Sequence, residues 1–79
     1  MTMKTKQFKI GEYAVGGIIK VVMDDKIVSI DALDYVTRKP IPFMKETFMK
    51  HDRNEIDQCL INLTTSYYTD KILEYIYNN

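Results

Sequence analysis

The sequence predicts an α+β fold: a small antiparallel β-sheet of three to four strands in the N-terminal part, packed against one or two C-terminal α-helices. Residues 7–49 carry short apolar and β-branched runs separated by turn residues, which is typical of strands. Residues 52–77 instead place apolar side chains at helical spacing. A run of strands followed by helices favours a helical layer on one face of an antiparallel sheet. We expect all 79 residues to form one domain.

A β-hairpin over residues 18–33 is the most definite local element. Its first strand, "IIKVVM" (18–23), contains four β-branched residues among six. The residues "DDK" (24–26) are typical of a tight turn. The segment "IVSIDAL" (27–33) returns as the partner strand, and its period of two defines two faces. One face carries Ile27, Ser29 and Asp31, and the other carries Val28, Ile30 and Ala32.

Ahead of this hairpin, "QFKIGEY" (7–13) alternates apolar and polar residues, which predicts another strand, and residues 1–6 are expected to be frayed. Gly16 and Gly17 come next. They are not expected to bind phosphate, because an anion loop normally precedes a helix and the segment after them is β-branched. We therefore interpret both glycines as the site of a bend or bulge.

After the hairpin, "DYVT" (34–37) continues the strand or begins a third one. The segment "RKPIP" (38–42) indicates an edge or a connector, since proline lacks the N–H that an inner strand needs. Residues 43–50, "FMKETFMK", fit either a strand or a helix, and both alternatives stay open.

The C-terminal part predicts helices. Asp52 and Glu55 resemble a capping box, and the apolar stripe that follows consists of Ile56, Cys59, Leu60 and Leu63. The weak helix formers of 64–69 favour a kink or break, with Thr69 as the cap of a second short helix, although a continuous helix stays open. This second helix presents Ile72, Leu73 and Ile76 on one face.

Composition argues for self-association and against a metal. A chain of 79 residues buries a limited core, and its single cysteine, Cys59, excludes an internal disulfide. Cys59 and His51 alone cannot form a structural zinc site. Oligomerisation, as a homodimer, is therefore the expected source of additional buried area. The formal net charge is zero, yet residues 1–50 contain nine Lys or Arg against six Asp or Glu, and residues 51–79 contain two against five.

No motif points to catalysis. His51 precedes Asp52, but sequence neighbours rarely face each other as a general base and its partner. The carboxylates of residues 24–34 lack a calcium-loop pattern and are typical of turns. We expect neither an enzyme nor a bound cofactor or metal. We also expect a cytoplasmic protein without a membrane partner, since the sequence shows no apolar run of spanning length, no signal peptide and only one thiol.

Two groups of residues are candidates for binding a macromolecule. Tyrosines concentrate near the C-terminus, and large amphipathic rings are common at protein interfaces. The predicted partner-binding residues are Tyr67, Tyr68, Tyr75 and Tyr77. The alternative is a basic sheet face that stacks nucleic-acid bases with help from Tyr13 or Tyr35. Its lysines are Lys4, Lys6, Lys9 and Lys20, although zero net charge makes a protein the favoured partner.

The leading functional hypothesis is therefore a non-catalytic protein-interaction module. The segment "FKIGEYAVGG" followed by a hairpin resembles, in size and composition, the small β-rich modules of short phage or mobile-element proteins. A small regulator or inhibitor encoded by a phage or mobile element, assembled as a homo-oligomer because its core is limited, fits this description. The alternative hypothesis is an accessory protein that binds nucleic acid.

Overall fold

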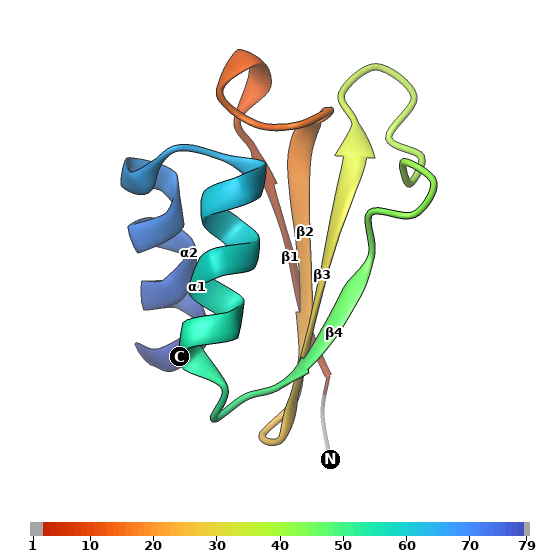
Figure 1. The fold of residues 1–79 in the computed structure, drawn as a ribbon. Coiled ribbons are helices and arrows are strands. Elements are labelled where there is room, and N and C mark those ends of the chain that lie inside the picture. The colour runs from red at the N-terminus through yellow and green to blue at the C-terminus, as the bar shows by residue number, and fades with distance from the viewer. Residues whose placement is uncertain (1–2, 79) are drawn as a thin grey trace.

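The computed structural model describes residues 3–78 and shows a four-stranded antiparallel sheet with two helices on one face (Figure 1). The strands are β1 (Lys4–Lys9), β2 (Gly17–Met23), β3 (Ile27–Asp34) and β4 (Glu46–Met49). A 3₁₀ turn at Gly11–Tyr13 separates β1 from β2. The helices are α1 (Arg53–Leu63) and α2 (Ser66–Asn78). The predicted α+β class is confirmed, with the strands in the order β1-β2-β3-β4.

The β2–β3 hairpin forms as predicted. Its register pairs Lys20 with Asp31 and Val22 with Ser29. The carboxylate of Asp24 closes the turn, because it accepts hydrogen bonds from the N–H groups of Lys26 (2.7 Å) and Ile27 (2.8 Å). These N–H groups also lower the pKa of Asp24, since they stabilise its charged form.

The first strand differs from the prediction at both ends. It begins at Lys4, so residues 4–6 pair with β2 and are not frayed, while residues 1–2 lie outside the described part of the chain. It ends at Lys9, because Gly11 takes a φ of 73° and turns the chain into the 3₁₀ segment. The local alternation in "QFKIGEY" extends past this glycine and therefore indicated too long a strand.

The ambiguous segment 43–50 contains strand β4, which pairs with β3 from Ile30↔Glu46 to Ile27↔Met49. Upstream, the N–H of Ile41 donates to the carbonyl of Ala32 (2.9 Å), so the Pro-containing segment also runs along the sheet edge. Proline fits there because the outer side of an edge strand needs no donor. Residues 42–45 lie between the Ile41–Ala32 hydrogen bond and strand β4, and they are not part of a strand.

The helical part is broken at Thr64 and Thr65. The prediction that Thr69 caps the second helix is wrong, because α2 begins at Ser66 and Thr69 lies inside it with its side chain fully buried. The N–H of Thr69 donates to the carbonyl of Thr65 (2.9 Å), within the first turn. Helix α1 begins just after Asp52 as expected, but no capping hydrogen bond forms from the Asp52 side chain.

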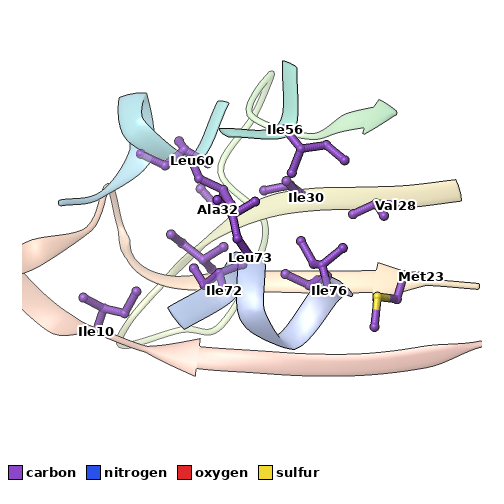
Figure 2. Packing of buried hydrophobic residues seen from close by; sticks show 13 residues of the cluster. Ile10, Met23, Val28, Ile30, Ala32, Ile56, Leu60, Ile72, Leu73 and Ile76 are labelled. Carbon is purple, nitrogen blue, oxygen red and sulfur yellow. The ribbon is translucent and has the colours of Figure 1, made fainter. Parts of the chain in front are cut away.

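The core lies between the helices and one face of the sheet (Figure 2). Period two in the strands and the helical stripe in α1 and α2 bring apolar side chains to this layer. The buried cluster consists of Ile10, Ile19, Val21, Met23, Val28, Ile30, Ala32, Ile56, Leu60, Leu63, Ile72, Leu73 and Ile76. The predicted faces of the hairpin and of the second helix are confirmed by this burial.

Candidate interaction surface

Three connecting segments meet at one end of the molecule: residues 11–16, residues 35–45 and the α1–α2 junction (Figure 1). Hydrogen bonds join them. The N–H of Val15 donates to the carbonyl of Leu63 (2.8 Å), and the N–H of Tyr35 donates to the carbonyl of Gly16 (2.8 Å). The Thr64 hydroxyl donates to the carbonyl of Tyr13. We call this region the loop end; its backbone is held by tertiary contacts between distant segments.

Three tyrosines form a continuous ring cluster at the loop end. Tyr13, from the 3₁₀ turn, stacks on Tyr68 of α2 with ring centroids 6.2 Å apart. Tyr68 in turn meets Tyr67 edge-on at 5.0 Å. Tyr68 is half-buried, whereas Tyr13 and Tyr67 are 53% and 61% exposed. We define these three residues as the tyrosine surface. It combines a fixed inner ring with two accessible outer ones.

An open groove of about 420 Å³ lies beside this surface, between the 3₁₀ turn and the helix junction. Its polar lining residues include Glu12, Asn62 and Thr65. Its remaining lining residues are Tyr13, Ala14, Val15, Leu63 and Thr64. The groove can therefore receive a side chain that combines apolar and hydrogen-bonding parts.

Tyr75 and Tyr77 have different roles from Tyr67 and Tyr68, although all four were predicted to bind a partner. The Tyr75 ring meets Phe8 of β1 edge-on, with centroids 5.7 Å apart. The Tyr77 hydroxyl donates to the carbonyl of Lys50 (2.7 Å). These two tyrosines therefore attach the end of α2 to the rest of the fold, and only the pair at its start borders the loop end.

The four lysines of the nucleic-acid hypothesis lie on two faces of the sheet. Lys4 and Lys6 pair with the core residues Met23 and Val21, which places them on the helix-bearing side. Lys9 and Lys20 fall on the opposite side by the alternation of the strands. The Lys6 ammonium sits 5.3 Å from the Phe8 ring and 5.4 Å from the Tyr75 ring. Nucleic-acid binding through these lysines stays a prediction.

The structure places His51 and Cys59, the two side chains weighed above for catalysis or metal binding, in different surroundings. The imidazole of His51 lies 3.3 Å from the Asp52 carboxylate, and both side chains are exposed. Burial, together with the neighbouring Glu46 carboxylate, raises the pKa of Cys59 to about 11, so the thiol is a poor nucleophile at neutral pH. In the same part of the chain, no three His, Cys, Asp or Glu side chains gather as metal ligands.

Residues 35–45 were not among the predicted binding residues, although the structure exposes large apolar side chains there. Phe43 is fully exposed and Val36 nearly so, although both are large and apolar. The two non-glycine residues with positive φ in the described chain, Arg38 (61°) and Phe43 (66°), also lie here. The Asp34 carboxylate anchors the segment by accepting from the N–H groups of Val36 and Thr37, both at 2.9 Å. The available signal was "PIPF", an aromatic residue that follows two prolines on a surface connector.

Comparison with protein-family models, with curated proteins and with solved structures found no match to this chain. Within residues 3–78, neither helix has the length and apolar character that crossing a bilayer requires.

Proposed function

We propose that this protein is a non-catalytic protein-interaction module, a small homo-oligomeric regulator or inhibitor that binds another protein through the tyrosine surface. The observation that carries the proposal is the contiguous cluster of Tyr13, Tyr68 and Tyr67, in which two large rings are exposed beside an open groove. Tyrosine is enriched among the residues that dominate binding energy at protein interfaces.

The packing of the cluster supports this role because it reduces the entropy that binding costs. Tyr68 is half-buried and contacts both other rings, which restricts their side-chain motion. The segments that carry them are joined by the hydrogen bonds of Val15 and Thr64. A surface that is already ordered loses little conformational freedom when a partner binds. Exposed rings that are held in place favour recognition over a purely structural role.

The residues that line the groove indicate which side chains of a partner it can bind. Glu12 and Asn62 flank it with an acceptor and an amide, next to the apolar side chains of Ala14 and Leu63. A partner segment with one apolar side chain and a neighbouring hydrogen-bond donor or cation fits these groups. We place this interaction in the cytoplasm, where a single thiol stays reduced, and a phage or mobile-element regulator has this size and composition.

The test compares the full chain with a Tyr13→Ala/Tyr67→Ala variant as bait in host extract, with captured proteins quantified by mass spectrometry. A captured protein is then purified and titrated by calorimetry. We expect each exposed ring to contribute about ten-fold or more to affinity. Tyr67→Phe should retain most of the binding, since the ring remains.

The matched control is Ile61→Ala, which removes an exposed apolar side chain from α1 without touching the tyrosine surface. Circular dichroism confirms that each variant is folded. A partner that binds the double variant with the affinity of the unmodified chain contradicts the proposal, as does a capture pattern that is identical for both baits.

A further inference from the structure

Exposed apolar side chains are concentrated at the loop end. Ten large apolar or aromatic side chains are exposed among residues 3–78, and six of them lie on residues 11–16, on residues 35–45 or at the start of α2. These six are Tyr13, Val15, Tyr35, Val36, Phe43 and Tyr67. The tyrosine surface accounts for only two of them. The other four extend the apolar area to a segment that the proposed function does not use, and such a concentration marks an interaction site.

Residues 35–45 pack directly against the turn that precedes β2. A Cβ added to Gly16 would lie 2.3 Å from Cδ1 of Ile41, and a Cβ added to Gly17 would lie 2.7 Å from Cβ of Tyr35. The two glycines therefore allow the segments to approach each other closely. Figure 1 shows both segments side by side at one end of the sheet. A single partner can consequently contact the tyrosine surface and residues 35–45 together.

The chain turns over residues 41–44 and exposes Phe43 there. The N–H of Met44 donates to the carbonyl of Ile41 (3.3 Å), and both of these side chains pack against the core. The Phe43 ring between them is fully exposed, while its backbone has a φ of 66° that a bulky residue rarely adopts. Burial within residues 3–78 does not compensate for this strain. Strain of this kind is concentrated at binding sites, so we interpret the ring as a contact for another molecule.

The same segment is basic. Residues 35–45 contain Arg38, Lys39 and Lys45 and no acidic residue. Among residues 3–78, none of these three cations forms an ion pair. The Asp34 carboxylate, next to the segment, accepts hydrogen bonds from two backbone N–H groups within it. The cations are therefore available to the carboxylates of another molecule, and their charge favours an acidic partner.

We propose that the loop end binds an acidic and apolar protein segment, with Phe43 contacting its apolar side chains and Arg38 and Lys39 pairing with its carboxylates. The proposal rests on the proposed function, because it describes the partner of the tyrosine surface. The groove beside that surface carries the negative charge of Glu12, so the part of the segment that lies there supplies a donor or a cation. The acidic part lies over residues 35–45, and this charge pattern fixes the direction of the bound segment.

A protein segment fits this surface better than a nucleic acid or a lipid bilayer does. Phosphate backbones and anionic lipids bind to clusters of many cations. The loop end has three cations together with the carboxylates of Glu12 and Asp34, on a chain of zero formal net charge. Aliphatic side chains, Val15 and Val36, lie among its exposed rings and offer no stacking surface for bases.

Selection from a random peptide library displayed on phage tests the chemistry of the partner, with the immobilised full chain as bait. We expect the enriched peptides to combine aspartate or glutamate with large apolar residues. A synthetic peptide of the most enriched sequence is then titrated by fluorescence anisotropy, and its affinity should fall as salt rises. Enrichment of basic peptides overturns the proposal, and so does a selection that enriches no sequence.

Charge reversal tests the basic segment. Arg38→Asp/Lys39→Glu should weaken binding of the selected peptide by about ten-fold or more, because it sets like charges against each other. Aspartate also tolerates the left-handed backbone at position 38. A second peptide, in which lysine replaces each acidic residue, should bind this variant more tightly than it binds the unmodified chain. Lys4→Glu/Lys26→Glu is the matched control, since it changes the charge equally at the opposite end of the sheet, and it should leave the affinity unchanged.

Two variants of Phe43 test the apolar contact. Phe43→Asn removes the ring while asparagine tolerates the backbone conformation, so the protein stays folded. This variant should weaken peptide binding by about ten-fold or more, and Phe43→Tyr should retain most of it. Circular dichroism checks that each variant keeps the fold.

The variants also separate this inference from the proposed function. A peptide whose binding Tyr13→Ala/Tyr67→Ala abolishes, but which is indifferent to the Arg38, Lys39 and Phe43 variants, overturns the inference and upholds the tyrosine surface. The reverse pattern upholds the basic segment and contradicts the role of the tyrosine surface. Oligonucleotides and phosphatidylserine vesicles are the remaining probes. If either binds in a manner that Arg38→Asp/Lys39→Glu abolishes, and acidic peptides are not enriched, the proposal of a protein segment is overturned.

Discussion

The hydroxyl of Tyr77, near the end of α2, donates a hydrogen bond of 2.7 Å to the backbone carbonyl of Lys50, just after β4. The Arg53 guanidinium lies 4.6 Å from the centre of the same ring. One side chain therefore links the last helix, the fourth strand and the start of α1. Desolvation raises the pKa of this tyrosine, because burial disfavours the phenolate.

Tyr77→Phe should lower the free energy of unfolding by about 1 kcal/mol, because it leaves the Lys50 carbonyl without its donor and keeps the ring. Urea denaturation followed by circular dichroism measures the change. Tyr67→Phe is the matched control, since this exposed tyrosine lies at the other end of α2. Equal stability of Tyr77→Phe and the unmodified chain contradicts a stabilising role for the hydrogen bond.

Gly16 should tolerate no side chain. A Cβ there would lie 2.3 Å from Cδ1 of Ile41 and 2.6 Å from the carbonyl oxygen of Leu33, at a φ of 74°. Gly16→Ala combines this clash with backbone strain, and we expect a loss of about 3 kcal/mol or more. Gly11→Ala is the control, because its φ is similar (73°) but no atom lies within 4 Å of the added Cβ. It should lose only about 1–2 kcal/mol.

Gly17→Val should also damage folding before it affects any binding. A Cβ at Gly17 would lie 2.7 Å from Cβ of Tyr35, and its φ is 104°. The expected result is a sharp drop in melting temperature. A variant with an unchanged melting temperature and an abolished partner interaction would show that these glycines serve binding and not the bend.

Replacing Thr69 with valine should stabilise the fold. Thr69 is completely buried, and its hydroxyl has no hydrogen-bond partner among the described residues. Thr69→Val keeps the shape and removes an unsatisfied polar atom, so the free energy of unfolding should rise by about 1 kcal/mol. Thr69→Ser is the control: it keeps the hydroxyl, loses a methyl group and should destabilise the protein. Destabilisation by valine would indicate that the hydroxyl has a partner such as a buried water.

The pH dependence of stability should report on Cys59. Its pKa is raised from 9.0 to about 11 by burial and by Glu46, so the folded protein holds the thiol proton more tightly than the unfolded chain does. This contribution to stability is fully present below pH 9.0 and disappears as pH rises through about 11. Urea midpoints measured across this range should fall more steeply for the unmodified chain than for Cys59→Ala. An identical pH dependence of the urea midpoint in both proteins would contradict the raised pKa of Cys59.

Oligonucleotides provide a test of the alternative function. With zero formal net charge and its four candidate lysines on two faces of the sheet, the chain should bind neither single- nor double-stranded oligonucleotides at low salt. Fluorescence anisotropy measures this directly. Binding that weakens steeply as salt rises, and that Lys9→Glu and Lys20→Glu reduce, would instead favour the nucleic-acid hypothesis.

The amino-acid sequence by itself determined the elements whose signal is local. The β2–β3 hairpin follows from β-branched residues on both sides of an Asp-containing turn, and the buried stripe of α2 follows from Ile72, Leu73 and Ile76 at helical spacing. Together they are sufficient for the α+β class. Burial and periodicity are properties of neighbouring residues, so they can be recognised without knowing the rest of the fold.

Only the tertiary structure decided how distant segments meet. Residues 4–6 become strand because β2 pairs with them, and residues 46–49 become strand because β3 does. Tyr67 and Tyr77 have the same chemistry, yet one lies exposed beside Tyr68 and the other is bonded to Lys50. The physical reason is that pairing, ring contacts and close approach depend on positions far apart in the chain, which local composition does not encode.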